Sequence, residues 1–126
     1  MMTNYETVIQ WLLDSPEPWT RYCTRRDLLG QPENSPEVLA DRAQLLAHPQ
    51  VRDIVAEVVP WRELPIKRHN DAGHPIYRLG VLADFGLRWT DLGLDETVQT
   101  LLMHQASEGA LQSVVNIARS FGGSGE

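Results

Sequence analysis

Prolines and glycines divide this chain into short amphipathic segments. Proline lacks a backbone N–H and clashes with the preceding helical turn, and glycine accepts the left-handed backbone that ends helices. Between them, apolar residues recur at three- and four-residue spacing, as Val8, Trp11 and Leu12 do in the first segment. The sequence predicts about six helices, at 4–14, 19–29, 36–47, 50–58, 75–85 and 96–105. One apolar stripe per helix favours stacked helical hairpins, an all-α fold in a single domain over 1–126.

Capping residues define the predicted ends of these helices. Asn4, Ser35 and Asp95 are candidate N-caps, and Gly30 and Gly86 are placed to end helices. Two stretches have no helical period, a long loop at 59–74 and a C-terminal tail at 106–126. Within the tail, 110–121 fits either a helix or an extended segment. A loop as long as 59–74 is uncommon in a compact domain unless it has a function or packs as a unit.

Charge and apolar run length exclude several classes of protein. The formal charge is −6 and the chain has no block rich in Lys or Arg, which argues against a nucleic-acid binder. The densest basic cluster, Arg21, Arg25 and Arg26, has Asp27 beside it and is predicted to be a solvated helix face. No apolar run approaches the roughly 20 residues of a spanning helix, so we expect no membrane association.

The single cysteine, Cys23, cannot form an internal disulfide, which favours a reducing compartment. The N-terminus lacks the features of a signal peptide, so the expected location is cytoplasmic. We interpret Cys23 as a buried, inert thiol rather than a nucleophile. His104 and Glu108 are spaced to form a surface pair if the last helix continues through both.

The stretch IKRHNDAGHPIYRL, at 66–79, contains the strongest candidate for chemistry. His69, Asp71 and His74 have side chains that zinc accepts as ligands. The alternative interpretation is structural: Asn70, Asp71 and Gly73 form turns, and His74 precedes a proline where a helix cap is wanted. The structural interpretation, with a solvent-facing histidine, is favoured.

Three aromatic residues lie near this loop or follow it. Trp61, Tyr77 and Trp89 are candidates to line a pocket for an apolar ligand. In a small helical domain the same residues serve as core, with their polar tips hydrogen-bonded. The core interpretation is favoured.

Several phrases resemble one family. WLLDSPEPWTRYCTRRDLLG (11–30), SPEVLADRAQLLAHPQVRDIVAE (35–57) and HPIYRLGVLADFGL (74–87) are similar to the opening of uncharacterised bacterial proteins of the prenyltransferase-like, terpenoid-cyclase-like α/α-toroid group. The resemblance implies an incomplete α/α toroid, either the N-terminal part of a longer chain or a shortened form. It brings no catalytic residue, because the chain lacks the DxDD run of the cyclases and Cys23 lies in the wrong region for the zinc ligands of the prenyltransferases.

Two hypotheses follow. The first is a helical structural or binding module without catalysis or cofactor of its own, whose open end pairs with another copy, a partner or the remainder of a longer chain. The second is a metal-dependent or small-molecule-binding enzyme that uses the 61–77 loop, with zinc as the implied metal.

Overall fold

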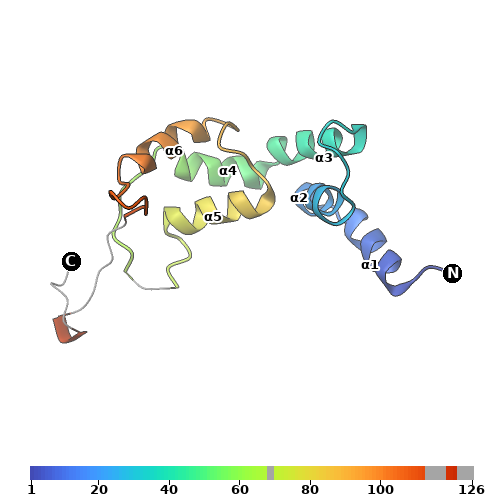
Figure 1. The fold of residues 1–126 in the computed structure, drawn as a ribbon, viewed down its shortest axis with the longest axis horizontal. Coiled ribbons are helices and arrows are strands. Elements are labelled where there is room, and N and C mark those ends of the chain that lie inside the picture. Colours follow the sequence, from blue (N-terminus) through green and yellow to red (C-terminus); the bar gives the residue numbers. More distant parts are fainter. Residues whose placement is uncertain (68–69, 113–118, 122–126) are drawn as a thin grey trace.

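The computed structural model describes residues 1–67, 70–112 and 119–121 (Figure 1). As predicted, the fold is all-α, and the described part of the chain contains no sheet; an isolated bridge joins Gln105 to Leu111. The described elements are α1 (Asn4–Leu13), α2 (Pro18–Cys23), the π-helical turn η1 (Thr24–Leu28), α3 (Pro36–Ala47), α4 (Pro49–Val58), α5 (Pro75–Phe85), α6 (Leu94–Leu102) and the 3-10 turn η2 (Arg119–Phe121). No helix among these residues has both the length and the apolar character needed to cross a membrane.

The predicted bounds of α3 and α5 are confirmed, and so is the position of Ser35 as the N-cap residue of α3, but the predicted caps of α1 and α6 are wrong. Thr3, not Asn4, caps α1: its hydroxyl accepts the Glu6 N–H (3.1 Å), and the Glu6 carboxylate accepts the Thr3 N–H (2.7 Å). Ser35 occupies the N-cap position of α3, but its hydroxyl donates to the Pro32 carbonyl (2.9 Å) and makes no capping bond to the helix. Asp95 lies in the first turn of α6, which follows the left-handed Gly93 and ends at Leu102 rather than 105.

The second predicted helix is continuous but changes its winding. After α2 the chain widens into η1, where the Leu29 N–H donates to the carbonyl of Thr24, five residues back (3.1 Å). The Thr24 hydroxyl donates to the carbonyl of Thr20 (2.7 Å) at the point where the winding changes. Gly30 then takes a positive φ of 62°, as its predicted place at the end of this helix requires.

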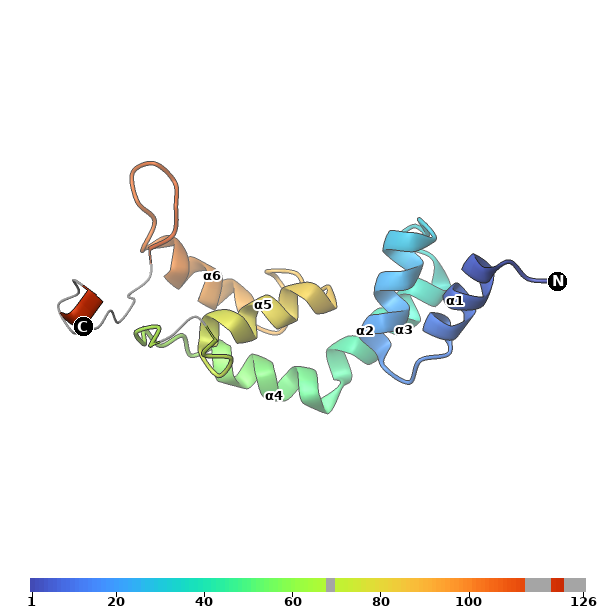
Figure 2. The ribbon, with the colours of Figure 1, turned by 90° about the horizontal axis from the view of Figure 1, so that it is seen from below.

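The helices form two lobes along an elongated molecule (Figures 1 and 2). In the N-terminal lobe, α1–α3, helix α2 packs on both α1 and α3. In the C-terminal lobe, α4–α6, helix α4 packs on both α5 and α6, and the hydroxyl of the buried Thr97 donates to the carbonyl of Val58 (3.0 Å). His48 ends α3 and also caps α4, with its Nδ1 accepting the Gln50 N–H (3.2 Å). A single residue therefore links the last helix of the N-terminal lobe to the first helix of the C-terminal lobe.

One apolar cluster extends through both lobes. Its buried members are Tyr22, Val38, Leu45, Val51, Val55, Val58, Leu82 and Leu94. Trp19 of α2 stacks on Phe85 at the end of α5 (4.3 Å between ring centroids) and meets the edge of His48 (4.9 Å). The lobes therefore share a core.

Ion pairs of α2 and η1 with α3 contradict the prediction that Arg21, Arg25 and Arg26 form a solvated helix face. Arg21 and Arg25 are not a solvated face, because both bind the largely buried carboxylate of Asp41 on α3 (2.8 and 2.7 Å). Only Arg26 of the predicted cluster pairs locally, with Asp27 (2.7 Å). Positions 21 and 25 share a helix face, which is why one carboxylate can bind both.

Candidate functional site

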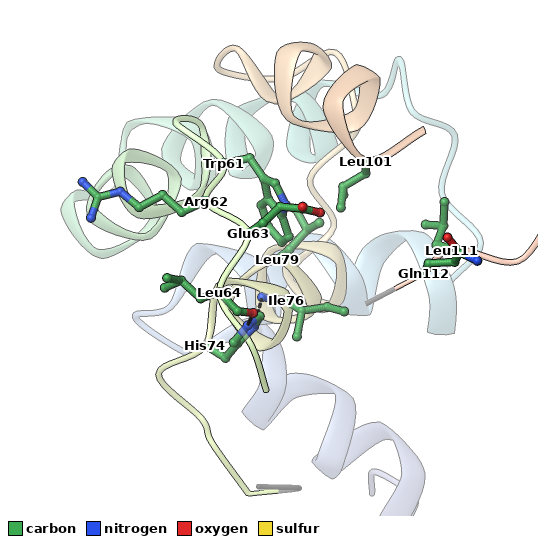
Figure 3. Close-up of a pocket in the computed structure, with 10 residues that line it drawn as sticks. All are labelled: Trp61, Arg62, Glu63, Leu64, His74, Ile76, Leu79, Leu101, Leu111 and Gln112. Carbon is green, nitrogen blue, oxygen red and sulfur yellow. Dashed lines mark hydrogen bonds between the residues drawn. The ribbon is translucent and has the colours of Figure 1, made fainter. Parts of the chain in front are cut away.

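A pocket lies where the loop after α4 meets the start of α5 and the end of α6 (Figure 3). Apolar side chains from all three segments line it, together with a few polar ones. The lining residues are Trp61, Arg62, Glu63, Leu64, His74, Ile76, Leu79, Leu101, Leu111 and Gln112. In Figure 3 the Glu63 side chain is drawn beside Trp61, Leu79 and Leu101, so the lining is mainly apolar with a carboxylate among it.

His74 is buried beside this pocket, contrary to the predicted solvent-facing position, but its predicted role as a cap is confirmed. Its Nδ1 accepts the Ile76 N–H (3.1 Å), which caps α5. Its Nε2 lies 2.6 Å from the Leu64 carbonyl oxygen, which can only accept. These partners place the ring proton on Nε2, which donates to the carbonyl, and leave Nδ1 unprotonated, with its lone pair accepting the Ile76 N–H. In this arrangement neither ring nitrogen is free to bind a metal.

The rest of the predicted zinc set is not brought together by the described residues. His69 lies outside them, and the backbone carbonyl of Asp71 accepts the His74 N–H in the turn (2.9 Å). Within the described residues no group of three or more His, Cys, Asp or Glu side chains could hold a metal ion. The zinc site therefore stays a prediction.

The three predicted aromatic residues do not share one pocket. Trp61 is half-buried and lines the pocket of Figure 3. Tyr77 is exposed, with its ring 6.4 Å from that of His74, and Trp89 is exposed over a separate groove beside Leu87 and Leu94. Trp61 alone of the three packs against the buried core, so the core interpretation was wrong for Tyr77 and Trp89.

At the rim of the pocket, His104 pairs with Glu63 (2.9 Å) and not with Glu108 as predicted. The predicted i, i+4 pair is absent because α6 ends at Leu102, and the chain then turns back so that Gln105 bridges Leu111. The side chains of His104 and Glu63 both reach solvent, 35% and 52% exposed, so the contact adds little to stability.

Cys23 lies apart from this pocket, against the end of α5. Its thiol donates to the carbonyls of Asp84 and Phe85, with Sγ–O distances of 3.7 and 3.6 Å. Burial raises the pKa of the Cys23 thiol, which keeps it protonated and unreactive at neutral pH.

The most exposed aromatic surface of the helices was not identified from the sequence. Tyr5, Val8 and Trp11 project from one side of α1, and Trp11 is 73% exposed. Val8 and Trp11, two of the residues that mark the helical period of this segment, are exposed, and Ile9 is the buried residue of α1. We call Tyr5, Val8 and Trp11 the α1 surface. Its i, i+3, i+6 spacing was the available signal, because it forms a second stripe beside Ile9 and leaves α1 apolar on two sides.

A groove borders the α1 surface where α1 turns into α2. We call it the α1–α2 groove; it is lined by Trp11, Leu12, Asp14, Ser15, Pro16, Glu17 and Thr20. Trp11 belongs to both features. The groove therefore combines an aromatic wall with two carboxylates.

Comparisons of the chain with models of protein families, with curated proteins and with solved structures found no match.

Proposed function

We propose that this chain is a helical interaction module, without catalysis of its own, that binds a partner protein through the α1 surface. The observation that carries the proposal is the 73% exposure of Trp11 on a helix whose other side is packed into the fold. Large apolar side chains grouped on a surface mark interaction sites, and buried tryptophan and tyrosine contribute most to binding in many interfaces.

The position of α1 supports this role. It lies at the end of the N-terminal lobe, away from the C-terminal lobe, in both views of the molecule (Figures 1 and 2). Tyr5 and Val8 extend the exposed strip from Trp11 along the helix. A rigid helix presents these side chains in a fixed arrangement, which reduces the entropy lost on binding.

We also propose that the module has the architecture of an incomplete α/α toroid, as the sequence resemblance implies. Successive helices pack in couples, α2 with α3 and α4 with α5, which is the unit that stacked hairpins repeat. An incomplete ring leaves a helix face without a neighbour. The lone thiol of Cys23 and the charge of −6 support a cytoplasmic protein that binds another protein rather than nucleic acid.

A peptide-display selection against the full chain tests the proposal. We expect enriched peptides whose affinity, measured by fluorescence anisotropy, falls by about tenfold or more in Trp11→Ala, since one buried tryptophan contributes that much or more. Trp89→Ala is the matched control, because Trp89 is also an exposed tryptophan but lies in the other lobe. Circular dichroism of each variant checks folding. Peptides that bind Trp11→Ala as tightly as the original chain, or a selection that enriches none, would overturn the proposal.

The second candidate, a small-molecule or metal site at the 61–77 loop, is favoured by the apolar pocket that Trp61 lines beside Glu63. Titration with decanol, followed through the indole N–H resonance of Trp61, tests ligand binding: a saturable shift at Trp61 supports it and no shift opposes it. Elemental analysis of the purified protein tests the metal. Stoichiometric zinc supports this candidate and absence of zinc removes its metal-dependent form.

A further inference from the structure

We infer that the partner segment, if it binds as proposed above, carries a lysine or arginine that enters the α1–α2 groove while apolar side chains beside it cover the α1 surface. The inference rests on the proposed function and adds the chemistry of the partner.

The groove offers the two groups that recognise such a side chain. Trp11 provides an exposed indole, and Leu12 and Pro16 provide apolar walls for an aliphatic stem. Asp14 and Glu17 provide carboxylates at the same groove. Tryptophan is the strongest aromatic partner of a cation, and the carboxylates add direct charge attraction.

The carboxylates of the groove are only lightly engaged within the chain. One oxygen of Asp14 accepts from Gln10 Nε2 (2.8 Å), and one oxygen of Glu17 accepts from the hydroxyl of Thr20 (3.3 Å). Neither bond supplies a positive charge. Each carboxylate therefore keeps its negative charge available to a partner.

The nearest cation does not neutralise the groove. Arg21 lies beneath it and donates to the Ser15 carbonyl (2.7 Å). Its other donors go to Asp41 (2.8 Å) and Gln44 (2.5 Å), and its side chain is only 14% exposed. Arg21 thus pairs with Asp41 in the interior rather than with Asp14 or Glu17.

A second copy of this chain is a poorer match than a basic partner. A symmetric pairing through α1 would bring together two surfaces that each carry Glu6, Asp14 and Glu17, and like charges repel across an interface. Among the described lysine and arginine side chains, three have no ion pair: Arg52, Arg62 and Lys67. They lie on α4 and the loop after it, away from α1 (Figure 1).

Three helical peptides with the same leucine and phenylalanine face test the inference; they carry lysine, glutamine or glutamate beside that face. Binding to the full chain is measured by fluorescence anisotropy. We expect the lysine peptide to bind about tenfold or more tighter than the glutamate peptide, with the difference shrinking from about 50 mM to about 300 mM NaCl.

Neutral variants then assign the effect to the groove. Asp14→Asn with Glu17→Gln is expected to weaken the lysine peptide about fivefold or more and to leave the glutamine peptide unchanged. The matched control is Asp95→Asn with Glu96→Gln, which removes two exposed carboxylates from the first turn of α6. This control should leave all three affinities unchanged.

The outcomes separate the inference from the proposed function. Equal binding of the lysine and glutamate peptides, lost from both in Trp11→Ala, overturns the cationic partner and retains the α1 surface. Binding of none of the three peptides overturns both. A chain that sediments as a dimer, and as a monomer in Trp11→Ala, overturns the inference by making a second copy the occupant.

Discussion

At the residue scale, Gly86 allows the end of α5 to lie close to Tyr22 of α2. Its φ is +98°, and a Cβ there would lie 2.7 Å from Cε1 of the buried Tyr22. We expect Gly86→Ala to lower the free energy of unfolding by about 2–3 kcal/mol, from backbone strain and the clash together. Urea denaturation measures it. Gly80→Ala, inside α5 with open space around its Cβ, should instead raise stability by up to about 1 kcal/mol, and equal losses in both variants would contradict this account.

Cys23 predicts a pH effect. Burial raises the thiol pKa in the folded protein above that of the unfolded chain, so its contribution to stability is complete below the unfolded pKa and is lost as pH rises through the folded one. Stability should therefore fall from about pH 8.5 upward. Urea denaturation of the original chain and of Cys23→Ala across this range measures the difference. An equally steep alkaline decline in both proteins would show that Cys23 is not its cause.

Between elements, a buried ion pair joins α3 to the turn before α6. Arg42 binds Asp91 (2.5 Å), and both side chains are nearly buried. Asp91 also accepts the backbone N–H of Arg88 (2.7 Å). A double-mutant cycle with Arg42→Gln and Asp91→Asn should give a coupling energy of about 1–3 kcal/mol.

The matched cycle uses Arg26 and Asp27, a pair of similar length (2.7 Å) that is more exposed. Its coupling energy should stay below about 1 kcal/mol, because water screens the pair. Similar couplings in the two cycles would mean that burial does not set the strength of these contacts.

Helix bounds were predictable where local signals agreed. Pro36 and Pro75 occupy first turns, and α3 and α5 begin there as predicted. At α1, Thr3 and Asn4 are both residue types that cap helices well. Thr3 is the N-cap because its side chain and that of Glu6 form reciprocal hydrogen bonds with each other's backbone N–H. The side of α1 that is buried could not be predicted, because the choice between Ile9 and Trp11 depends on where α2 lies.

For the whole molecule, the continuous core predicts how the lobes unfold. Leu45 and Leu82 belong to different lobes but to one buried cluster. We expect tryptophan fluorescence and far-ultraviolet circular dichroism to report a single coincident transition in urea. Leu45→Ala should move both probes together while lowering stability by about 2–5 kcal/mol. Two separated transitions would show that the lobes are independent and that the chain is not one domain.

The sequence by itself determined that the chain is all-α and where most of its helices lie, because periodicity, proline and glycine act over three or four residues. Only the tertiary structure decided what each side chain meets. Burial of His74, the pairing of Arg21 and Arg25 with Asp41, the partner of His104 and the exposure of Trp11 all depend on segments distant along the chain. Such contacts are set by which helix faces pack together, and no local pattern encodes that choice.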